Sequence, residues 1–484
     1  MGKLSDVVRT GSYVYMASIA NNLGGYTYWL IVSILAGPSP LGITSAIIGL
    51  ASLIVAALSL GVNVALQRFI GACEGRGDVE CRRRYFWSSL TYGLVVYSVS
   101  ASIVLFLGLF GRSISNFTPL MLEFVSVLIL VMGLSQILWF YMIARLKTKL
   151  LFEVATVSNL LKIAVGSLLV YLGFDWIGAV TGYLLMSVTL VAVNGAVALR
   201  EEGLRFIIDF YAIRELLRAG ASAWLPNFIV LMGQWLGVLA VFGYKTSIET
   251  GHYYAAYSIA MFLIAVATLV LGVLLPILSA MESGREELTA RSTRLALLAV
   301  APLALYIAYY PRPVLRLLGP SYVAAAPALT ILTLSSLPYT TIAAANNLAY
   351  SYGKYRLVLA LGLAQALPRI LLYPVLTPRY GALGTALAVY TGAVIGGTTS
   401  LYFSKLLSLE HPYRDYLVGI LLPLGILLPV KLLGTPWLMA GLLALTAYPL
   451  YVRLGVVPRE DVEEVLEAIG GQRLRSLLRR ISGG

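Results

Sequence analysis

Two cationic side chains lie inside apolar stretches of this chain, where a charge is costly. Arg369 stands in AQALPRILLYPVLTPRYGALG (364–384), and Lys162 stands in NLLKIAVGSLLVYLGFDWIGAVTG (159–182). An arginine at a helix centre costs roughly 2.5–3.5 kcal/mol to insert into a bilayer, and its guanidinium cannot lose its proton. Because cationic donors in a medium of low dielectric constant suit phosphate oxygens, this pattern favours a site for a phosphorylated ligand.

The two cations occupy corresponding places in two parts of the chain. Lys162 precedes Gly178-Ala179 by 16 residues, and Arg369 precedes Gly381-Ala382 by 12. The difference is about one helical turn, which changes the depth of a charge but keeps its face. Such a degenerate repeat is typical of transporters whose substrate site lies between two halves.

Few carboxylates are available within the spans to form ion pairs with these cations, since nearly every Asp and Glu falls in a predicted loop or at the end of a span. Glu123 is the exception and is the candidate for binding a coupling ion. A substrate pyrophosphate would supply the missing negative charge. The alternative is structural: Lys162 pairs with carbonyls or reaches the interface, and Arg369 caps a turn broken by proline.

Further polar residues could contact other parts of a substrate. Arg68 either receives a lipid phosphate or anchors its helix at the inner face. Gln365 lies one turn before Arg369 on the same helix face. The remaining amides bind either sugar hydroxyls or neighbouring helices. The substrate candidates among these amides are Asn21, Asn22, Asn227 and Gln234, and the others are Asn159, Asn346 and Asn347.

Composition identifies the elements that hold these residues as membrane helices. Of 484 residues, 59% are hydrophobic and 12% are charged, and the mean hydropathy is +0.85. The apolar runs are too long for the strands of an outer-membrane barrel, so the predicted fold is an all-α polytopic membrane protein of about fourteen spans. The predicted spans are 11–36, 41–67, 85–110, 118–144, 154–173, 176–199, 219–243, 251–280, 294–309, 322–350, 357–376, 380–403, 415–432 and 436–452.

Proline and glycine mark special places within these spans. Prolines interrupt the runs at 322–350 and 357–376; Pro226, Pro338, Pro368 and Pro374 are either hinges or ordinary kinks. Three GxxxG pairs predict close helix packing. They are Gly178–Gly182, Gly233–Gly237 and Gly392–Gly396.

The basic residues predict the orientation in the membrane. Of the 35 Lys and Arg residues, 27 fall on the side that holds both termini, 6 fall on the other side, and the last two are Lys162 and Arg369. By the positive-inside rule both termini are cytoplasmic, in a cell membrane. The net charge of +13 therefore indicates topology and not nucleic-acid binding.

The spans and charges divide the chain into five segments. We expect a first lobe, an amphipathic cytoplasmic linker, a second lobe, two further spans and a basic amphipathic tail, which either binds anionic headgroups or is solvated. Their ranges are 1–199, 200–218, 219–403, 404–455 and 456–484.

Catalytic and metal chemistry find little support. Cys73 and Cys81 share one predicted inner loop at a spacing unlike zinc knuckles, which predicts two unpaired thiols. We expect no metal and no cofactor. Asp175, Glu249 and His252 are scattered over two predicted outer loops without a paired-carboxylate spacing, and no Walker-type phosphate loop occurs.

Three stretches resemble the polysaccharide-exporter and lipid-linked-oligosaccharide flippases of the multidrug/oligosaccharidyl-lipid/polysaccharide exporter superfamily. The residues around a turn, a second helix and its cytoplasmic exit are similar, as are two later outer turns. The stretches are LAGPSPLGITSAIIGLASLIVAALSLGVNVALQRFIG (35–71), VLRLLGPSYVAAAPALTILTLSSL (314–337) and LTPRYGALGTALAVYTGAV (376–394). The resemblance implies two six-helix lobes around a central cavity, with helices 13 and 14 outside, and substrates carried on polyprenyl pyrophosphate.

The predicted function is a flippase, not an enzyme, that moves a lipid-pyrophosphate-linked oligosaccharide to the outer leaflet by alternating access. We expect a monomer whose partners are this substrate and membrane lipids. A cation-coupled multidrug exporter of the same superfamily is the first alternative, although such exporters need carboxylates within the membrane. A membrane glycosyltransferase or ligase that uses lipid-linked donors is the second, and it would need an acid, base or metal ligand near the outer face.

Overall fold

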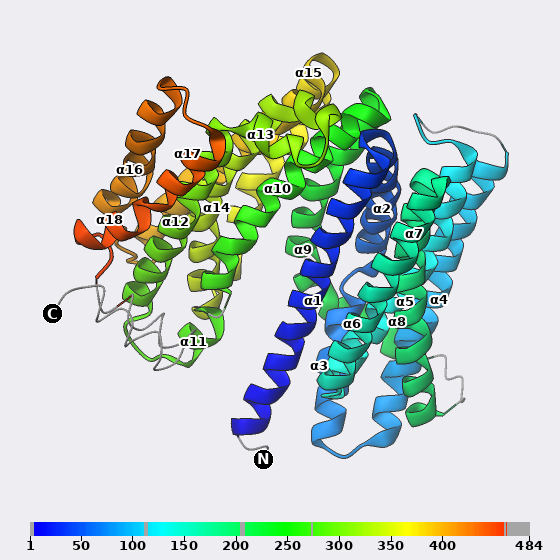
Figure 1. The fold of residues 1–484 in the computed structure, drawn as a ribbon. Helices are drawn as coiled ribbons and strands as arrows, with labels where there is room; N and C mark the ends of the chain where they lie inside the picture. The colour runs from blue at the N-terminus through cyan, green and yellow to red at the C-terminus, as the bar shows by residue number, and fades with distance from the viewer. Residues whose placement is uncertain (1–3, 111–114, 204–208, 273, 459–460, 462–484) are drawn as a thin grey trace. The chain divides into compact units, whose positions relative to one another are not determined.

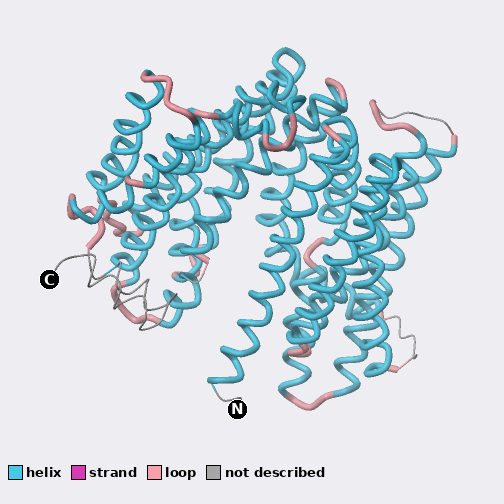
Figure 2. Tube along the Cα trace, viewed as in Figure 1, coloured by secondary structure: helices cyan, strands magenta, loops and turns pink. Residues whose placement is uncertain are grey.

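The structure, a computed structural model, describes residues 4–110, 115–203, 209–272, 274–458 and 461. These residues form helices and short connections, and Figure 2 shows no strand among them. The all-α prediction is confirmed. Because the backbone polar groups of a helix are satisfied within the helix, such an architecture suits a chain that is apolar over most of its length.

The first part of the chain runs from α1 to α8 (Figure 1). The helices are α1 Leu4–Ala36, α2 Pro38–Ser59, α3 Val62–Gly75, α4 Val79–Leu109, α5 Pro119–Ala144, α6 Thr148–Leu161, the π-helix η1 Lys162–Gly166, α7 Ser167–Leu169, the π-helix η2 Val170–Phe174 and α8 Asp175–Glu202. The remaining helices are α9 Phe210–Tyr244, α10 Ser247–Leu271, α11 Leu274–Ala280, α12 Arg285–Tyr309, α13 Pro311–Arg316, the 3₁₀ helix η3 Pro320–Ala325, α14 Ala326–Ser351, α15 Tyr355–Leu406, α16 Tyr413–Leu432, α17 Trp437–Leu445 and α18 Ala447–Arg453.

Ten helical stretches among the described residues are long and apolar enough to cross a membrane. Two of them, Thr148–Glu202 and Tyr355–Leu406, each contain two of the predicted spans, joined at a tight break. Among the described residues, each predicted span lies mostly on helix, with short interruptions such as the turn at Leu60-Gly61 within 41–67, and the number of fourteen crossings stays a prediction.

The prolines do not end the helices that contain them. Pro226 lies inside α9, Pro338 inside α14, and Pro368 and Pro374 inside α15. The prolines therefore interrupt the apolar runs in sequence without ending the helices, and the choice between hinges and ordinary kinks stays a prediction. A proline removes one backbone hydrogen bond, and membrane helices tolerate this loss when neighbouring groups satisfy the freed carbonyl.

The chain divides into two compact units. Unit 1 comprises 1–258, 315–328 and 366–392, and unit 2 comprises 259–314, 329–365 and 393–484. In unit 1, α5 packs against α2, α4 and α8 around buried residues such as Phe86 and Tyr141. In unit 2, α12 packs along α16, with Val300 and Leu348 in the core. The predicted lobes and segments stay predictions; residues 204–208 of the predicted linker and most of the predicted tail lie outside the described residues.

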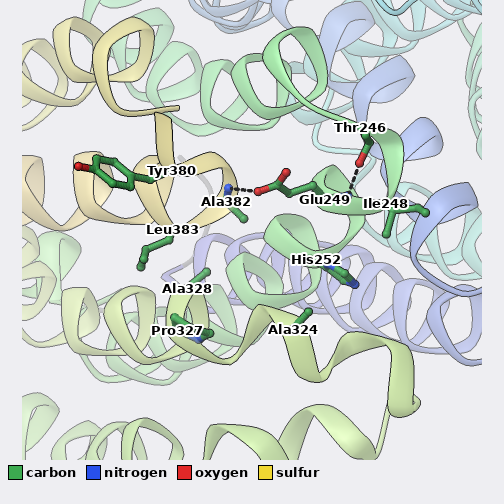
Figure 3. A pocket seen from close by; sticks show the side chains of 10 residues that line it. All are labelled: Thr246, Ile248, Glu249, His252, Ala324, Pro327, Ala328, Tyr380, Ala382 and Leu383. Atoms are coloured by element: carbon green, nitrogen blue, oxygen red, sulfur yellow. Dashed lines mark hydrogen bonds between the residues drawn. The ribbon is translucent and has the colours of Figure 1, made fainter. Parts of the chain in front are cut away.

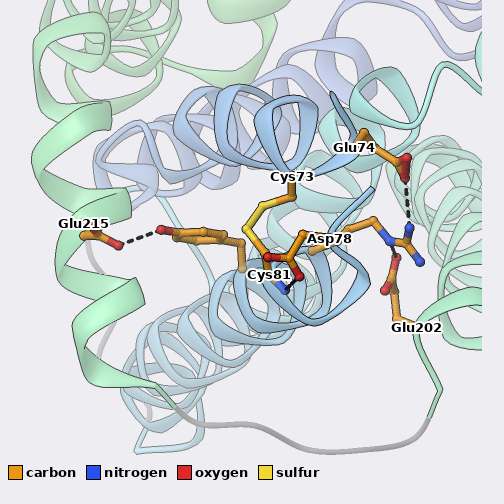
Figure 4. Close-up of a disulfide and its surroundings, with 8 residues drawn as sticks. Cys73, Glu74, Asp78, Cys81, Glu202 and Glu215 are labelled. Atoms are coloured by element: carbon orange, nitrogen blue, oxygen red, sulfur yellow. Dashed lines mark hydrogen bonds and ion pairs between the residues drawn. A yellow bond between two sulfur atoms is a disulfide. The ribbon is translucent and has the colours of Figure 1, made fainter. Parts of the chain in front are cut away.

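A short hairpin between α3 and α4 brings the two cysteines together. Cys73 and Cys81 form a disulfide with their Cα atoms 5.8 Å apart (Figure 4). The prediction of two unpaired thiols is therefore wrong. The eight-residue separation spans the end of one helix and the start of the next, and this turn brings the Cα atoms into the usual range for a disulfide.

Candidate functional site

Lys162 is the first residue of η1, and its side chain is 2% exposed. Its ammonium nitrogen lies 4.8 Å from the ring centroid of Tyr183 and 5.5 Å from that of Tyr28. Within the described part of the chain, no carboxylate forms an ion pair with Lys162. A desolvated cation–π contact contributes about 2 kcal/mol, so the rings compensate the charge without neutralising it.

The helices around Lys162 hold these rings in place. The Tyr28 hydroxyl donates a hydrogen bond of 2.7 Å to the carbonyl of Ala179 in α8. A side chain at Gly166 or Gly182 would overlap the Tyr28 hydroxyl. A Cβ at Gly182 would also lie 3.0 Å from the Lys162 carbonyl oxygen. The glycine pair Gly178–Gly182 therefore does permit close helix packing, as its spacing predicts.

Arg369 lies in α15 and is 4% exposed. Its guanidinium occupies the space that a side chain at Gly233 of α9 would need. One turn further along α15, the Tyr373 hydroxyl donates a hydrogen bond of 3.0 Å to the Gly233 carbonyl. At Gly237, the hydroxyls of Tyr253 and Tyr373 occupy the space that a side chain would need. The glycine pair Gly233–Gly237 thus makes room for the side chains of neighbouring helices.

The helices that carry Lys162 and Arg369 each contain a backbone break after the cation, and these breaks change how the two repeats align. Asp175 (φ 44°, ψ −127°) and Gly381 (φ 55°, ψ −129°) share one unusual conformation. Asp175 follows Lys162 by 13 residues, and Gly381 follows Arg369 by 12. Asp175, and not Gly178, therefore corresponds to Gly381. The mismatch falls from four residues to one, and the π-helical turns of η1 and η2 can accommodate an extra residue.

A layer of aromatic rings lies beside Lys162 in unit 1. We call Trp29, Tyr183, Trp235 and Tyr254 the aromatic layer. Trp29 lies 5.4 Å from Tyr183 and 4.7 Å from Tyr254, and Trp235 stacks on Tyr254 at 6.3 Å. Each residue lies 7 to 9 positions from the predicted outer end of its helix, or about 11–14 Å at 1.5 Å per residue. The layer therefore joins α1 and α8 to α9 and α10 at one depth.

The other predicted site residues are scattered. Asn21 accepts a hydrogen bond of 2.7 Å from Asn159, which is the interhelical use of these amides. Gln365 is buried in unit 2, where it packs against Gly396. Asn22 and Arg68 are exposed, and Gln234 and Glu123 are half-buried. The side chain of Asn227 lies outside the described residues.

A charged network at the predicted cytoplasmic end was not expected from the sequence. The carboxylate of Glu202, which is fully buried, accepts hydrogen bonds from Arg82 at 2.7 Å and from Tyr141 at 2.6 Å. Arg82 also binds Glu74 at 3.0 Å, beside the disulfide (Figure 4). These residues are far apart in sequence and lie at helix ends, so no local pattern reveals their pairing.

The same region ties α9 to α4. Tyr85 donates a hydrogen bond of 2.6 Å to Glu215, and Arg84 forms an ion pair with Asp209. Desolvation opposes ionisation of Asp209, but hydrogen bonds from the Ala212 and Tyr211 amides and from Arg84 lower the pKa of this carboxyl. Asp209 therefore stays ionised as the N-cap of α9.

The described residues hold no group of three or more His, Cys, Asp or Glu side chains that could bind a metal ion. Of the three polar residues considered for an enzyme, Asp175 begins α8, whereas Glu249 and His252 line one cavity.

The described helices include ten stretches that are long and apolar enough to cross a membrane. The chain belongs to the family of polysaccharide biosynthesis proteins, whose family model matches residues 31–327. An uncharacterized membrane protein of Methanocaldococcus jannaschii is 27% identical over 137 residues, which is 28% of this chain and 27% of that protein. The match therefore spans about a quarter of the length of this relative.

Solved structures of very low sequence identity share the fold. A lipid II flippase, MurJ, in an inward closed conformation has a TM-score of 0.77 at 15% identity, over 92% of this chain and 99% of MurJ. An inward-facing multidrug resistance transporter of the MATE family, from the MOP superfamily, has a TM-score of 0.58 at 14% identity, over 79% of this chain and 94% of the transporter. The predicted resemblance to polysaccharide exporters is confirmed by the family model, which contains the first stretch, 35–71, and part of the second, whereas 376–394 lies outside the matched residues.

Proposed function

We propose that this protein is a flippase that moves a polyprenyl-pyrophosphate-linked oligosaccharide from the cytoplasmic to the outer leaflet. The observation that carries the proposal is Lys162: a buried ammonium that touches the rings of Tyr28 and Tyr183 and forms no ion pair among the described residues. A pyrophosphate would satisfy it with charge-assisted hydrogen bonds, which are stronger than cation–π contacts. Family membership and the fold shared with a lipid II flippase support the same substrate class.

Arg369 is the second cation for the headgroup. It is buried at the corresponding place in the repeat and is lodged against Gly233. Arg68, Gln365, Asn21, Asn22, Asn227 and Gln234 are candidates for contacts with the rest of the substrate, and Asn21 is the weakest because Asn159 already binds it. The headgroup enters from the cytoplasmic face and leaves outward as two lobes rock, while the lipid tail stays in the bilayer.

The experiment is a leaflet-exchange assay with purified protein in liposomes. A fluorescent polyprenyl-pyrophosphate oligosaccharide is placed in the liposomes, and its loss of protection from a membrane-impermeant quencher is followed. We expect Lys162→Gln to lower the rate about tenfold or more, because a hydrogen bond to a charged group contributes about 1.5–3 kcal/mol. Arg369→Gln should have a similar effect.

Lys431→Gln is the matched control, since this lysine also lies on a tyrosine ring, 4.9 Å from the centroid of Tyr309, but outside the proposed site. Folded yield and thermal unfolding are measured for each variant. Equal rates for the wild type, Lys162→Gln and Arg369→Gln would remove these cations as headgroup ligands.

A cation-coupled multidrug exporter is the second candidate, because MATE transporters share the fold. Glu123 would then bind the coupling ion. Efflux of a cationic dye that depends on a sodium or proton gradient, and that Glu123→Gln abolishes, would favour this function over the flippase.

A further inference from the structure

Three turns at the predicted outer end of unit 1 enclose a cavity of about 400 Å³ (Figure 3). The beginning of α10 contributes Thr246, Glu249 and His252 to its lining. η3 and the first turn of α14 contribute small apolar walls, and the break in α15 contributes Tyr380, Ala382 and Leu383. The volume is in the range of small-molecule sites, and the lining combines apolar walls with a few polar groups, as such sites do.

Glu249 occupies a fixed place in this cavity. One oxygen of its carboxylate accepts a hydrogen bond of 3.0 Å from the amide of Ala382, which Figure 3 shows as a dashed line. The carboxylate fills the space that a side chain at Gly381 would need, so the glycine and the glutamate fit together. The other carboxylate oxygen has no hydrogen-bond partner among the described residues.

His252 holds the opposite side of the cavity. A ring nitrogen of His252 lies 2.7 Å from the carbonyl oxygen of Ser321 in η3. The hydroxyl of Thr246 accepts a hydrogen bond of 3.2 Å from the Glu249 amide. Glu249 and His252 each use one polar atom to join two turns, whereas the Thr246 hydroxyl bonds within the first turn of α10. The second carboxylate oxygen of Glu249 and the second nitrogen of His252 remain for a ligand.

The chemistry of the lining excludes several ligand classes. Among the described residues that line the cavity there is no lysine or arginine, and Glu249 repels anions, so this lining does not suit a phosphate. A metal ion needs more ligands than one carboxylate and one imidazole, and the described residues hold no larger cluster here. A purely apolar ligand would leave the second carboxylate oxygen of Glu249 and the second ring nitrogen of His252 without partners. A neutral ring that carries hydroxyl donors on its edge and C–H groups on its faces satisfies both kinds of wall.

We propose that this cavity binds a neutral sugar ring, with Glu249 accepting hydrogen bonds from its hydroxyl groups and Tyr380 covering one face at the cavity mouth. The inference rests on the proposed function, because a sugar of the translocated oligosaccharide would reach this cavity on the outer side. The site would hold the glycan after the pyrophosphate has left Lys162. Tyr380 is exposed, as a ring that receives a ligand must be.

The test uses full-length protein in lipid nanodiscs that contain no glycoside detergent. Saturation-transfer-difference NMR is recorded with N-acetylglucosamine, glucose, choline and glycerol 3-phosphate as separate probes. We expect signals from one or both sugars and none from choline or glycerol 3-phosphate. Saturation by choline alone, or by glycerol 3-phosphate alone, would overturn the proposal.

Two variants connect the signal to the cavity. Glu249→Gln keeps an acceptor for the Ala382 amide but removes the charge, and we expect sugar affinity to fall about tenfold. Ala324→Trp fills the cavity from an exposed position and should abolish the signal, whereas Leu317→Trp, on a nearby exposed position that does not line the cavity, should leave it unchanged. A sugar signal that survives Ala324→Trp would overturn the proposal.

The same preparations distinguish this inference from the proposed function. Lys162→Gln should keep the sugar signal while it loses lipid exchange. Absence of any sugar signal, together with lipid exchange that depends on Lys162, would reject the sugar site and leave the flippase intact. A sugar signal in a protein that exchanges no lipid would support the site and reject the flippase.

Discussion

At the scale of single residues, the positions of the two buried cations depend on nearby glycines, whose missing side chains leave room, as much as on charge. The guanidinium of Arg369 has its position because Gly233 has no side chain. The ammonium of Lys162 has its position because Gly166 and Gly182 allow Tyr28 to approach. These glycines set where each cation lies, and they are testable without removing either charge.

We predict that Gly233→Ala lowers transport without unfolding the protein. The added Cβ overlaps the end of a flexible side chain, so the guanidinium moves aside while the helices stay in place. Alanine also gains about 0.5–1 kcal/mol over glycine within a helix, which offsets part of the lost packing. Leaflet exchange in liposomes should fall about as far as in Arg369→Gln, with thermal unfolding within a few degrees of the wild type.

Gly25→Ala is the control for this substitution, since no atom lies within 4 Å of the added Cβ in α1. This variant should transport as the wild type does. If Gly233→Ala also transports normally, then the position of Arg369 against α9 is not the one that serves transport.

The sequence revealed the two cations but not their surroundings. Lys162 and Arg369 stand out because apolar residues flank them, which is a local signal. Glu249 lies 133 residues before Ala382, and at the sequence level it was only a carboxylate in an outer loop. A contact of that kind depends on how three turns meet, and no periodicity along one helix records it.

At the scale of elements, the breaks after Lys162 and Arg369 have the same backbone shape but different residues. Gly381 adopts its positive φ at no steric cost, whereas Asp175 adopts nearly the same angles with a side chain. A residue other than glycine in such a conformation costs about 1–3 kcal/mol. The first break is therefore strained, and the second is not.

We predict opposite effects of substitutions at these two positions. Asp175→Gly should relieve the backbone strain but lose the favourable interaction of an acidic side chain with the N-terminus of α8. The net effect should be a stabilisation of about 1 kcal/mol. Gly381→Ala should destabilise it by about 2 kcal/mol or more, because the Cβ adds a clash with Glu249 to the backbone strain. Thermal unfolding of the purified proteins measures both effects.

Glu249→Ala in the Gly381→Ala background separates the two costs. Removing the carboxylate should recover the steric part of the loss and leave the backbone part, which a double-mutant cycle reports as a coupling energy. Changes of the same sign at Asp175 and Gly381 would contradict the assignment of strain to Asp175.

The elements themselves were largely predictable, and their breaks were not. Apolar runs of about twenty residues located the helices because length and hydropathy are local properties. The pairing of Gly178 with Gly381 failed because a shared Gly-Ala dipeptide was taken as the landmark, while the actual landmark is a backbone angle that Asp175 also adopts. π-Helical turns add a residue without an obvious sequence signature. The alignment of Asp175 with Gly381 therefore could not be recognised from sequence spacing.

At the scale of the whole molecule, the boundaries of the two compact units fall inside α10, α13, α14 and α15. A boundary within a continuous helix carries no linker composition, so the sequence suggested lobes that begin and end at loops. At this scale the sequence also predicts the orientation in the membrane. The basic residues are distributed 27 to 6 between the two predicted faces, which is a strong bias for loops this short.

This bias makes a prediction for the complete protein in its membrane. In a background in which Cys73 and Cys81 are replaced by serine, single cysteines are placed at four exposed positions, two for each predicted face. They are Leu317→Cys and Leu433→Cys for the outer face, and Leu146→Cys and Tyr413→Cys for the inner face. A membrane-impermeant maleimide should label the first pair in intact cells and all four after the membrane is opened, because only the outer face meets the reagent in intact cells. Labelling of the second pair alone in intact cells would invert the topology and place the proposed sugar cavity on the cytoplasmic side, where it would meet the glycan before translocation and not after it.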